Sequence, residues 1–448
     1  MRDLWITLVF VMMLGMGLTA PFVAGLGYVW IDTFFPQRLA NELLGQVPAS
    51  LIMGVVTFVT YLLLDRRAPP RLNMIFLLTL FMAGWITLTG TWAVAPPDMV
   101  WEKWNWAFKG VLFSAFLPFL FRSRVQIEAV LLVLIFSVAG HILPWGIKAA
   151  LGGAGYDRGL GLMPVNTIPL SESSFTAAVA LMVVPLLAAL RRHSLLFPHP
   201  AVRKYLFLGL IAAMLAGAMG TFARTALVGF AVLGAGMWMR SRRKFAFSAV
   251  ILIAVLGLSL IASDSWKARM STTENFDTES SAAARIKVWE WTLGYTIEHP
   301  LGGGFNSYVI DSIVVMTGDG KPLFRTGVAF HNVYFEVLGE HGWIGLATIL
   351  SIMGLSLLAL QQTIRRTRNH PELLWCHDLA RALQIGQLVM MACGGFVGIG
   401  FQPMLWNLFG LAVCLREYAH RALAQQAPRP GWSESALAGP AGVARGVF

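Results

Sequence analysis

The sequence predicts an all-α polytopic membrane protein of about twelve transmembrane helices, and three observations support this fold class. The 448 residues are 56% hydrophobic and 13% charged, with a mean hydropathy of +0.65, whereas a soluble protein carries about 25% charged residues. Apolar runs of roughly 18 or more residues recur along the chain, which is the length that a spanning helix requires. These runs are continuous and do not alternate with polar residues, which excludes a β-barrel.

The first apolar run lacks a small-residue cleavage site after it, so we interpret it as a retained span and not as a removed signal. The twelve predicted spans are residues 4–28, 47–64, 73–94, 107–121, 127–149, 172–190, 203–220, 222–239, 245–262, 337–361, 379–396 and 400–416. The fourth and the last two are short enough to be tilted, broken or partly re-entrant.

Basic residues concentrate in the loops on one side of these spans, for example at Arg66–Arg67, Arg191–Arg192 and Arg240–Lys244. The positive-inside rule therefore predicts that both termini are cytoplasmic. The one long loop, residues 263–336, is then outside, which in a bacterium means the periplasmic side of the inner membrane. The net charge of +11 is mostly a topology signal, and we expect no nucleic-acid partner.

The spans and the long loop divide the chain into four parts. Residues 1–262 form an N-terminal transmembrane bundle of nine spans, and residues 263–336 form a periplasmic loop with catalytic elements. Residues 337–420 form the C-terminal transmembrane helices. Residues 421–448 form a cytoplasmic tail, rich near its end in Pro, Gly and Ala, that we expect to be disordered. The three cysteines are far apart and predict no disulfide framework.

The long loop contains an amphipathic helix followed by a run of glycines. Ile286, Trp289, Leu293 and Ile297 recur at helical spacing, which predicts a helix lying on the membrane surface. The run Gly302–Gly304 allows either a close backbone approach or a mobile turn. A phosphate-binding loop is weakly supported, because no strand precedes the glycines and no Gly-Lys-Ser/Thr follows them.

Arginines on the outer side are candidates for binding phosphate groups. Arg224 occupies the tight junction between spans seven and eight, and Arg285 opens the surface helix. A guanidinium group matches phosphate oxygens with two parallel hydrogen bonds, and a helix N-terminus also favours anions. The alternatives are a snorkelling Arg224 and an Arg285 that contacts solvent or lipid headgroups. Arg325 is a weaker candidate of the same kind.

His331 lies where the long loop meets the tenth span. A histidine titrates near neutral pH and can accept a proton from a sugar hydroxyl, although a capping or hydrogen-bonded interfacial histidine is the alternative. We interpret His341 as structural. Glu336 and Glu340 are expected to project elsewhere on the helix, where they could orient partners.

Other outer-side residues are weaker candidates for contacting a substrate. Arg158 lies in the loop after span five, and Lys109 is a charge just inside span four that could face a substrate cavity. The tryptophans of 101–106 are typical interfacial anchors, with stacking on sugar rings as the alternative. We find no glycosidase carboxylate pair, metal-ligand spacing, serine elbow or Walker loop. We therefore expect no metal or cofactor, and an activated diphosphate substrate as the source of energy.

Three segments of the chain resemble the O-antigen ligase and polymerase superfamily: Arg224 at an outer helix junction, the loop from Arg285 to Phe305, and the segment from His331 to Gly342. The chain start at 1–4, the loop at 36–40 and the segment at 101–104 also resemble a subgroup described as O-glycosylation or cell-surface polysaccharide ligases. The similarity extends in order over residues 1–420.

The resemblance implies a GT-C-like, metal-independent, inverting glycosyltransferase of the bacterial inner membrane. Such an enzyme takes a glycan from undecaprenyl diphosphate on the periplasmic side, and a ligase passes it to a sugar hydroxyl of lipid A–core. By resemblance, Arg224 and Arg285 bind the diphosphate and His331 activates the acceptor hydroxyl. The subgroup carries an acidic-Asn-Asn run near span six; here Leu170-Ser-Glu172-Ser-Ser stands there, so that Glu172 keeps the acidic role without the amides.

The residues leave three enzymatic alternatives open, because all three share the donor chemistry. They are a ligase acting on lipid A–core, a polymerase that extends a chain on its own lipid carrier, and a protein O-glycan ligase. A transporter of lipid-linked glycans is the alternative from another class. It would require charges deep inside several spans and broken helices in corresponding halves of the chain, and the sequence shows no internal repeat.

Overall fold

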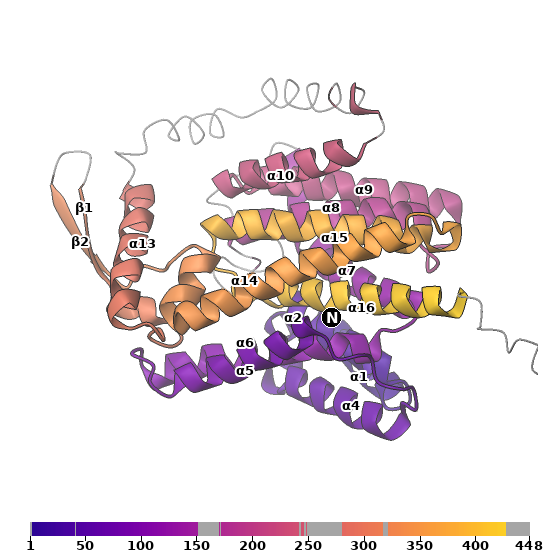
Figure 1. The fold of residues 1–448 in the computed structure, drawn as a ribbon, viewed down its shortest axis with the longest axis horizontal. Helices are drawn as coiled ribbons and strands as arrows, with labels where there is room; N and C mark the ends of the chain where they lie inside the picture. Colours follow the sequence, from indigo (N-terminus) through magenta and orange to yellow (C-terminus); the bar gives the residue numbers. More distant parts are fainter. Residues whose placement is uncertain are drawn as a thin grey trace, which may run out of the picture.

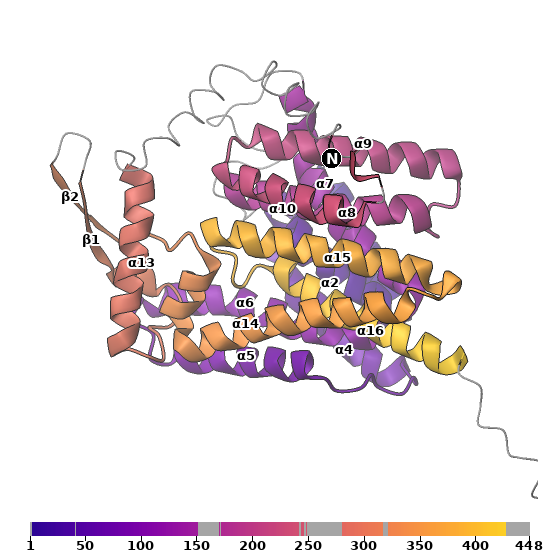
Figure 2. The same cartoon turned by 45° about the horizontal axis from the view of Figure 1, so that its top comes forward.

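The computed structural model describes residues 2–40, 42–150, 172–241, 243–245, 280–316 and 321–426, together with Leu170 and Ser248. Over these residues the protein is mostly helical, and most of the long helices run side by side along the longest axis of the molecule (Figure 1). A helix and a β-hairpin project beyond one end of this bundle, as both views show (Figures 1 and 2).

The part of the chain before the long loop forms α1 (Arg2–Gly17), α2 (Pro21–Phe34), α3 (Pro36–Leu39), η1 (Leu44–Gln46), α4 (Ala49–Leu64), α5 (Met74–Gly90), α6 (Pro97–Leu120), α7 (Arg124–Ala150), α8 (Ser173–His193), α9 (Pro200–Gly220) and α10 (Arg224–Arg240). The rest forms α13 (Ser280–Glu298), η4 (Ser307–Ile310), β1 (Ser312–Met316), β2 (Pro322–Thr326), α14 (Val333–Thr367), η5 (Pro371–Leu373), α15 (Leu374–Cys393), η6 (Gly394–Phe396) and α16 (Pro403–Gln426).

Five stretches among the described residues are long and apolar enough to cross a membrane: 124–144 within α7, then α8, α9, α14 and Pro371–Phe396. The helices α4 and α5 are shorter but also apolar. These helices support a polytopic helical membrane protein. The total of twelve spans and their orientation stay predictions, and the predicted span at 245–262 lies almost wholly outside the described residues.

The bundle is centred on α8. Buried residues make up 89% of its most apolar stretch, against 28% for that of α9, so α8 is enclosed whereas most of α9 is not buried by the described residues. The neighbours of α8 are α15, α9 and α10, and α14 packs in turn on α15, α16 and α5. Because α8 begins beside the site described below, its burial fixes one wall of that site.

The first predicted span, residues 4–28, is divided in the structure. α1 ends at Gly17 and α2 begins at Pro21, a residue whose missing N–H is tolerated in the first turn of a helix. A Cβ atom on Gly17 would lie 2.7 Å from Cβ of Ala24, so the two helices approach closely at the turn. Hydropathy alone cannot detect this break, because the turn is as apolar as the helices beside it.

The tenth predicted span, residues 337–361, lies inside α14, which is broken at Gly342. Gly342 adopts φ 66° and ψ −168°, a conformation that glycine adopts most readily. The break separates a short helical segment, Val333–His341, from the long spanning part that follows. A Cβ atom on Gly342 would lie 2.1 Å from the carbonyl oxygen of Pro300, so this position has no room for a side chain.

The long loop contains a β-hairpin that the all-α prediction missed. β1 and β2 pair antiparallel, with Ile313 opposite Arg325. Ile313 and Val315 are buried and pack with Val288 of α13 and with Phe330. The signal was present in the sequence, because Ser-Ile-Val-Val-Met is rich in β-branched residues of the kind that strands favour.

The predicted amphipathic helix is present as α13, and it packs on the protein through a face other than the apolar one that was assigned to the membrane surface. Val288, Thr292 and Thr296 are fully buried, whereas Ile286 and Ile297 are 49% and 76% exposed. Threonine can occupy the buried face because its hydroxyl bonds to a carbonyl one turn earlier, as Thr292 does to Val288. The exposed apolar residues are consistent with a helix at a lipid surface, which stays a prediction.

The C-terminal tail begins later than the predicted boundary at residue 421. α16 continues to Gln426, because Arg421 holds the last turns against the bundle by donating from Nη2 to the carbonyl oxygen of Arg122 at 2.7 Å. The remaining tail residues, 427–448, lie outside the described residues.

Candidate functional site

A polar cavity of about 250 Å³ lies at the end of the bundle from which α13 and the hairpin project. Its walls come from α6, from the start of α14 and from the segments that precede α8, α14 and α16. The described residues that line it are Lys103, Trp106, Glu172, Asn306, Tyr308, Ala329, Phe330, His331, Glu336, Glu340, Gly398 and Gln402. Two of the residues singled out from the sequence, His331 and Glu172, are among them.

His331 is held in the cavity wall by the residues on both sides of it. Its own backbone has a φ of 47°, a left-handed conformation that costs a non-glycine residue about 1–3 kcal/mol. Trp289 Nε1 donates to the carbonyl oxygen of Phe330 at 2.8 Å. Asn332 Oδ1 caps α14 by accepting from the N–H of Tyr334 at 2.8 Å. These contacts fix the strained turn from which the imidazole enters the cavity.

The surroundings of His331 favour its neutral form. Burial lowers the pKa of His331 below its usual 6.5, and the positive charge of Arg285 lowers it further, while the negative charge of Glu336 opposes both. A histidine with a lowered pKa is unprotonated at pH 7 and can therefore accept a proton.

Glu172 precedes the first residue of α8 and lies in the same electrostatic environment. Burial raises the pKa of Glu172 to about 7, Arg285 works against that increase, and Glu336 adds to it. Because Arg285 acts on both Glu172 and His331, the structure brings these three predicted residues together around one cavity. Arg285 itself is on α13, at the edge of the site, and is not among the residues that line the cavity.

Lys103 forms a buried ion cluster with two carboxylates in the cavity wall. Its Nζ lies 2.9 Å from Glu336 Oε1 and 2.8 Å from Glu340 Oε1. The three side chains are 15%, 11% and 0% exposed. The carboxylates also accept from backbone donors, Glu336 from Gly400 N–H and Glu340 from Asn306 N–H, each at 2.9 Å. One lysine and two carboxylates leave a formal charge of −1 inside the wall.

This cluster was not predicted from the sequence. Lys103 belongs to the tryptophan-rich segment 101–106 before span four, and Glu336 and Glu340 were expected to lie on another part of the helix surface from His331. The available signal was their spacing, since residues four apart share one face of a helix. The lysine that joins them lies more than two hundred residues away in the chain, which no local pattern can reveal.

The triple glycine supports the end of the segment that carries the carboxylates. Gly303 N–H donates to the carbonyl oxygen of Gly339 at 2.9 Å, and Gly304 N–H donates to that of Glu340 at 2.8 Å. Gly304 adopts φ 73°, and a Cβ atom on it would lie 2.4 Å from Cβ of Ala93. The glycines therefore provide the close backbone approach that the sequence allowed, and all three of their N–H groups donate to carbonyl oxygens and are not offered to a phosphate.

Arg224 is the first residue of α10 and follows a tight turn in which Phe222 has a φ of 54°. The next residue, Thr225, donates to Ser174 Oγ at 3.1 Å, which brings the N-terminus of α10 next to that of α8. Arg224 thus lies near the element that carries Glu172, although it is not among the described residues that line the cavity.

Two further predicted residues, Lys109 and Arg325, are described by the structure and do not line the cavity. Lys109 donates to Ser50 Oγ of α4 at 3.2 Å, and Arg325 lies opposite Ile313 in the hairpin. Arg158 is outside the described residues. His341 is fully buried, with Nδ1 2.7 Å from Thr89 Oγ1, as expected for a structural histidine.

The fold and the site together define a polytopic helical membrane protein with a titratable polar cavity at one end of its bundle. Residues 209–350 match the family model described as O-antigen ligase, and residues 1–195 match one described as a family of unknown function (DUF5935). The match at 209–350 supports the O-antigen ligase and polymerase superfamily as the family of this chain. No curated protein matches the chain significantly.

The match to the O-antigen ligase family carries a coarse functional statement. It indicates a glycosyltransferase-like membrane protein whose substrates are, in general, a lipid-linked glycan and an acceptor. Arg224, Arg285 and His331 all lie in the region that matches the O-antigen ligase family, whereas Lys103 and Glu172 lie in the region that matches the family of unknown function. The cavity is thus built from both matched regions.

Proposed function

We propose that this protein is an inner-membrane O-antigen ligase. It transfers a glycan from undecaprenyl diphosphate to a sugar hydroxyl of lipid A–core on the periplasmic side, without a metal ion and with inversion at the transferred sugar. One observation carries the proposal: His331, with a lowered pKa, lies in the wall of a polar cavity within reach of the charge of Arg285. That histidine and that arginine both belong to the region matched by the O-antigen ligase family.

The proposed reaction is a direct displacement. His331 accepts the proton of the acceptor hydroxyl, and the oxygen attacks C1 of the donor sugar from the face opposite the diphosphate. The bond between C1 and the diphosphate oxygen breaks, so the configuration at C1 inverts and undecaprenyl diphosphate leaves. Arg285 and Arg224 bind the diphosphate and stabilise the negative charge that grows on it in the transition state.

The Lys103 cluster fits this reaction through its charge. When His331 takes the proton it becomes a cation, and the negative charge of Glu336 favours that cation. The lysine favours the ionised forms of both carboxylates and holds them in place, since an unpaired buried carboxylate would tend to take up a proton. Glu336 is therefore a positioning residue in this proposal, and His331 is the catalytic base.

Polar side chains on the other walls of the cavity suit a sugar acceptor. Asn306, Tyr308 and Gln402 offer hydrogen-bonding groups, and Trp106 offers an aromatic face. Protein sites of this kind combine an apolar surface with a few placed polar groups. A polymerase or a protein O-glycan ligase would present a hydroxyl to the same histidine, so the acceptor is what the experiment below distinguishes.

The test is glycan transfer by the purified full-length protein in nanodiscs, with undecaprenyl-diphosphate glycan, lipid A–core and EDTA. We expect transfer by the wild type and a fall of about 10²–10⁴-fold for His331→Ala, the range for loss of a general base. The matched control is His370→Ala, which changes a surface histidine paired with Glu372 and should leave transfer unchanged.

Other results would identify a different activity or overturn part of the mechanism. A longer lipid-linked glycan with unmodified lipid A–core would identify a polymerase. Transfer only to an added acceptor protein would identify a protein glycan ligase. Loss of activity in EDTA that is restored by a divalent cation would overturn the metal-free mechanism, and equal transfer by His331→Ala would remove His331 from it.

A further inference from the structure

A second cavity, of about 370 Å³, lies at the opposite end of the bundle from His331. The helix α16 connects the two ends, because Gln402 just before it lines the first cavity and His420 and Arg421 line the second. Eighteen residues of α-helix extend about 27 Å, which is close to the thickness of a bilayer core. The second cavity is therefore separate from the proposed catalytic site, and it lies on the side that the basic loops predict to be cytoplasmic.

Positive charge dominates this second cavity. Arg71, Arg122 and Arg421 line it, together with Glu417 and His420. The positive charge of Arg67 lies next to Arg122. The guanidinium group of Arg67 is held by Asp65, because its Nε donates to Asp65 Oδ1 at 2.9 Å. Four arginines and two carboxylates leave a formal charge of +2 with the histidine neutral. The described residues thus do not neutralise the cavity from within.

Two of these arginines are held in place by backbone groups. Arg122 Nη1 donates to the carbonyl oxygen of Ala68 at 2.7 Å, and Arg421 Nη2 donates to that of Arg122 at 2.7 Å. Arg122 Nε is buried and has no hydrogen-bond partner among the described residues. Burial lowers the pKa of Arg122, and the charge of Arg67 adds to this. An anion bound in the cavity would relieve the repulsion between these guanidinium groups.

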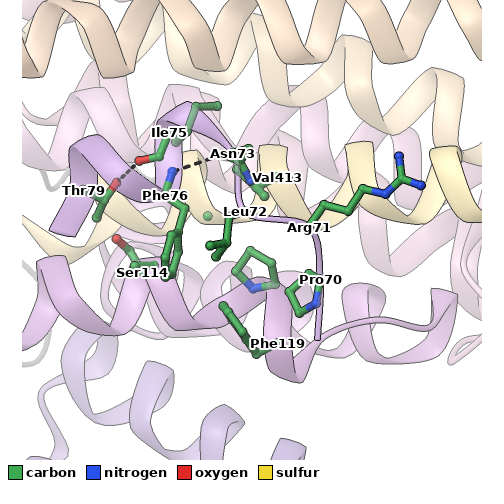
Figure 3. Close-up of a pocket in the computed structure, with 13 residues that line it drawn as sticks. Pro70, Arg71, Leu72, Asn73, Ile75, Phe76, Thr79, Ser114, Phe119 and Val413 are labelled. Carbon is green, nitrogen blue, oxygen red and sulfur yellow. Dashed lines mark hydrogen bonds between the residues drawn. The ribbon is translucent and has the colours of Figure 1, made fainter. Parts of the chain in front are cut away.

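A small apolar pocket, with a volume of only about 20 Å³, adjoins the charged cavity and shares Pro70, Arg71 and Pro118 with it. Figure 3 shows Arg71 directing its guanidinium away from the apolar side chains of that pocket. The apolar lining includes Leu72, Ile75, Phe76, Phe119 and Val413. Charged and apolar surfaces that meet in this way match the two parts of an amphiphile, namely a phosphate group and the start of an acyl chain.

We infer that these two adjoining pockets bind one anionic phospholipid, with its phosphate among Arg71, Arg122 and Arg421 and its chain against the apolar pocket. Basic pockets between transmembrane helices are known sites for lipid headgroups. The apolar pocket favours a lipid over a free phosphate ion, although both would use the same arginines. The lipid would fasten α16 to the loop between α4 and α5, both of which contribute residues to the pockets.

The experiment counts lipids that remain on the full-length protein in native mass spectrometry after detergent exchange. The probes are phosphatidylglycerol and phosphatidylcholine with identical acyl chains, and inorganic phosphate in a parallel thermal-shift assay. The test variant is Arg71→Gln with Arg421→Gln. The control is Arg365→Gln with Arg366→Gln, which removes two exposed arginines at the end of α14.

We expect the wild type and the control to retain phosphatidylglycerol in preference to phosphatidylcholine. The bound fraction should fall by about fivefold for each arginine removed, as expected when basic residues attract anionic lipid. If the double variant does not fold, the single change Arg71→Gln tests the same contact, because that side chain is exposed.

Other outcomes would distinguish a phospholipid from a free phosphate ion, or would overturn the inference. Stabilisation by inorganic phosphate that equals stabilisation by phosphatidylglycerol would assign the site to a free phosphate group. If the two lipids are retained equally, or if the test and control variants lose equal fractions of bound phosphatidylglycerol, the inference is overturned. These arginines would then attract anionic lipid only as general surface charges and not as parts of a specific binding site. Glycan transfer is not the readout, so failure here and failure of the proposed ligase activity are distinguishable.

Discussion

The two cavities at the ends of the bundle manage buried charge in opposite ways. At the His331 end, Lys103 lies between two carboxylates that also accept backbone hydrogen bonds, so most of the charge is compensated inside the protein. At the other end, four arginines meet two carboxylates and a buried Nε has no described partner. In the first cavity the contacts within the protein hold the charged side chains in place. In the second cavity a net positive charge is left for an anion from outside to balance. Changes at the first end should therefore cost far more stability than changes at the second.

The largest expected effect is at the break in α14. Gly342→Ala places a Cβ atom 2.1 Å from the Pro300 carbonyl oxygen, at a positive φ. The backbone must shift to accept it, and we expect folded protein to be largely lost from the membrane. Gly354→Ala is the matched control in the same helix, because nothing lies within 4 Å of its Cβ position. Size-exclusion profiles of the two variants in detergent check this, and equal profiles would contradict the packing described here.

A smaller but still large effect is expected from Lys103→Met. Removing one partner of a buried ion cluster typically destabilises a protein by about 3–5 kcal/mol, because Glu336 and Glu340 would remain buried without their cation. Lys287→Met is the control, since its pair with Glu290 is half exposed and should be worth about 0–1 kcal/mol. Thermal unfolding measured by tryptophan fluorescence compares the two, and adding Glu340→Gln to Lys103→Met should recover part of the loss.

The pH dependence of transfer tests the electrostatics of the cavity without unfolding it. Transfer should fall as the pH drops through the lowered pKa of His331, because the imidazolium cannot accept a proton. Arg285 lowers that pKa, so Arg285→Gln should move the acid limb of kcat to higher pH, towards the usual 6.5. Arg325→Gln is the control, because that arginine is in the hairpin. Profiles at saturating donor separate this shift from weaker binding, and an unmoved acid limb would show that Arg285 does not act on His331.

The smallest effect is expected at the other end of the bundle. Arg71→Gln should change the free energy of unfolding in detergent by no more than about 0.5 kcal/mol, as for surface substitutions in general. Added phosphatidylglycerol should stabilise the wild type more than this variant, because the variant has lost one phosphate contact. A large loss of stability without lipid would mean that Arg71 is structural, and the contrast between the two ends would fail.

The sequence predicted the helical fold and two of the residues that line the cavity, His331 and Glu172, because both predictions rest on local signals. Long apolar runs indicate helices, and a histidine between a polar loop and an apolar helix marks a surface site, so His331 and Arg285 could be singled out in advance. The Lys103 cluster could not be predicted, because it joins residues that are far apart in the chain. The division of the first span escaped for another reason, since the turn at 18–20 is as apolar as its flanks.

The face of α13 shows a further limit of pattern reading. Its apolar spacing predicted a side that lies on the membrane surface, and in the structure threonines occupy the interior while Ile286 and Ile297 stay exposed. Hydrophobic periodicity locates the side of a helix that avoids water, but around a membrane that side can face lipid instead of protein. The packing of Val288 against the hairpin shows which side of α13 faces the protein.

The break at Gly342 bears on how the protein tolerates different membranes. A spanning helix adapts to bilayer thickness by tilting, and in a continuous helix that tilt would carry every residue along. Here the segment from Val333 to His341 is fastened to Gly303 and Gly304 by hydrogen bonds, and the helical ladder is interrupted before the spanning part begins. Trp343 N–H donates to the carbonyl oxygen of Pro300 at 3.0 Å, so the loop holds the chain on both sides of the break, and the height and aim of His331 are set by the loop and not by an unbroken spanning helix.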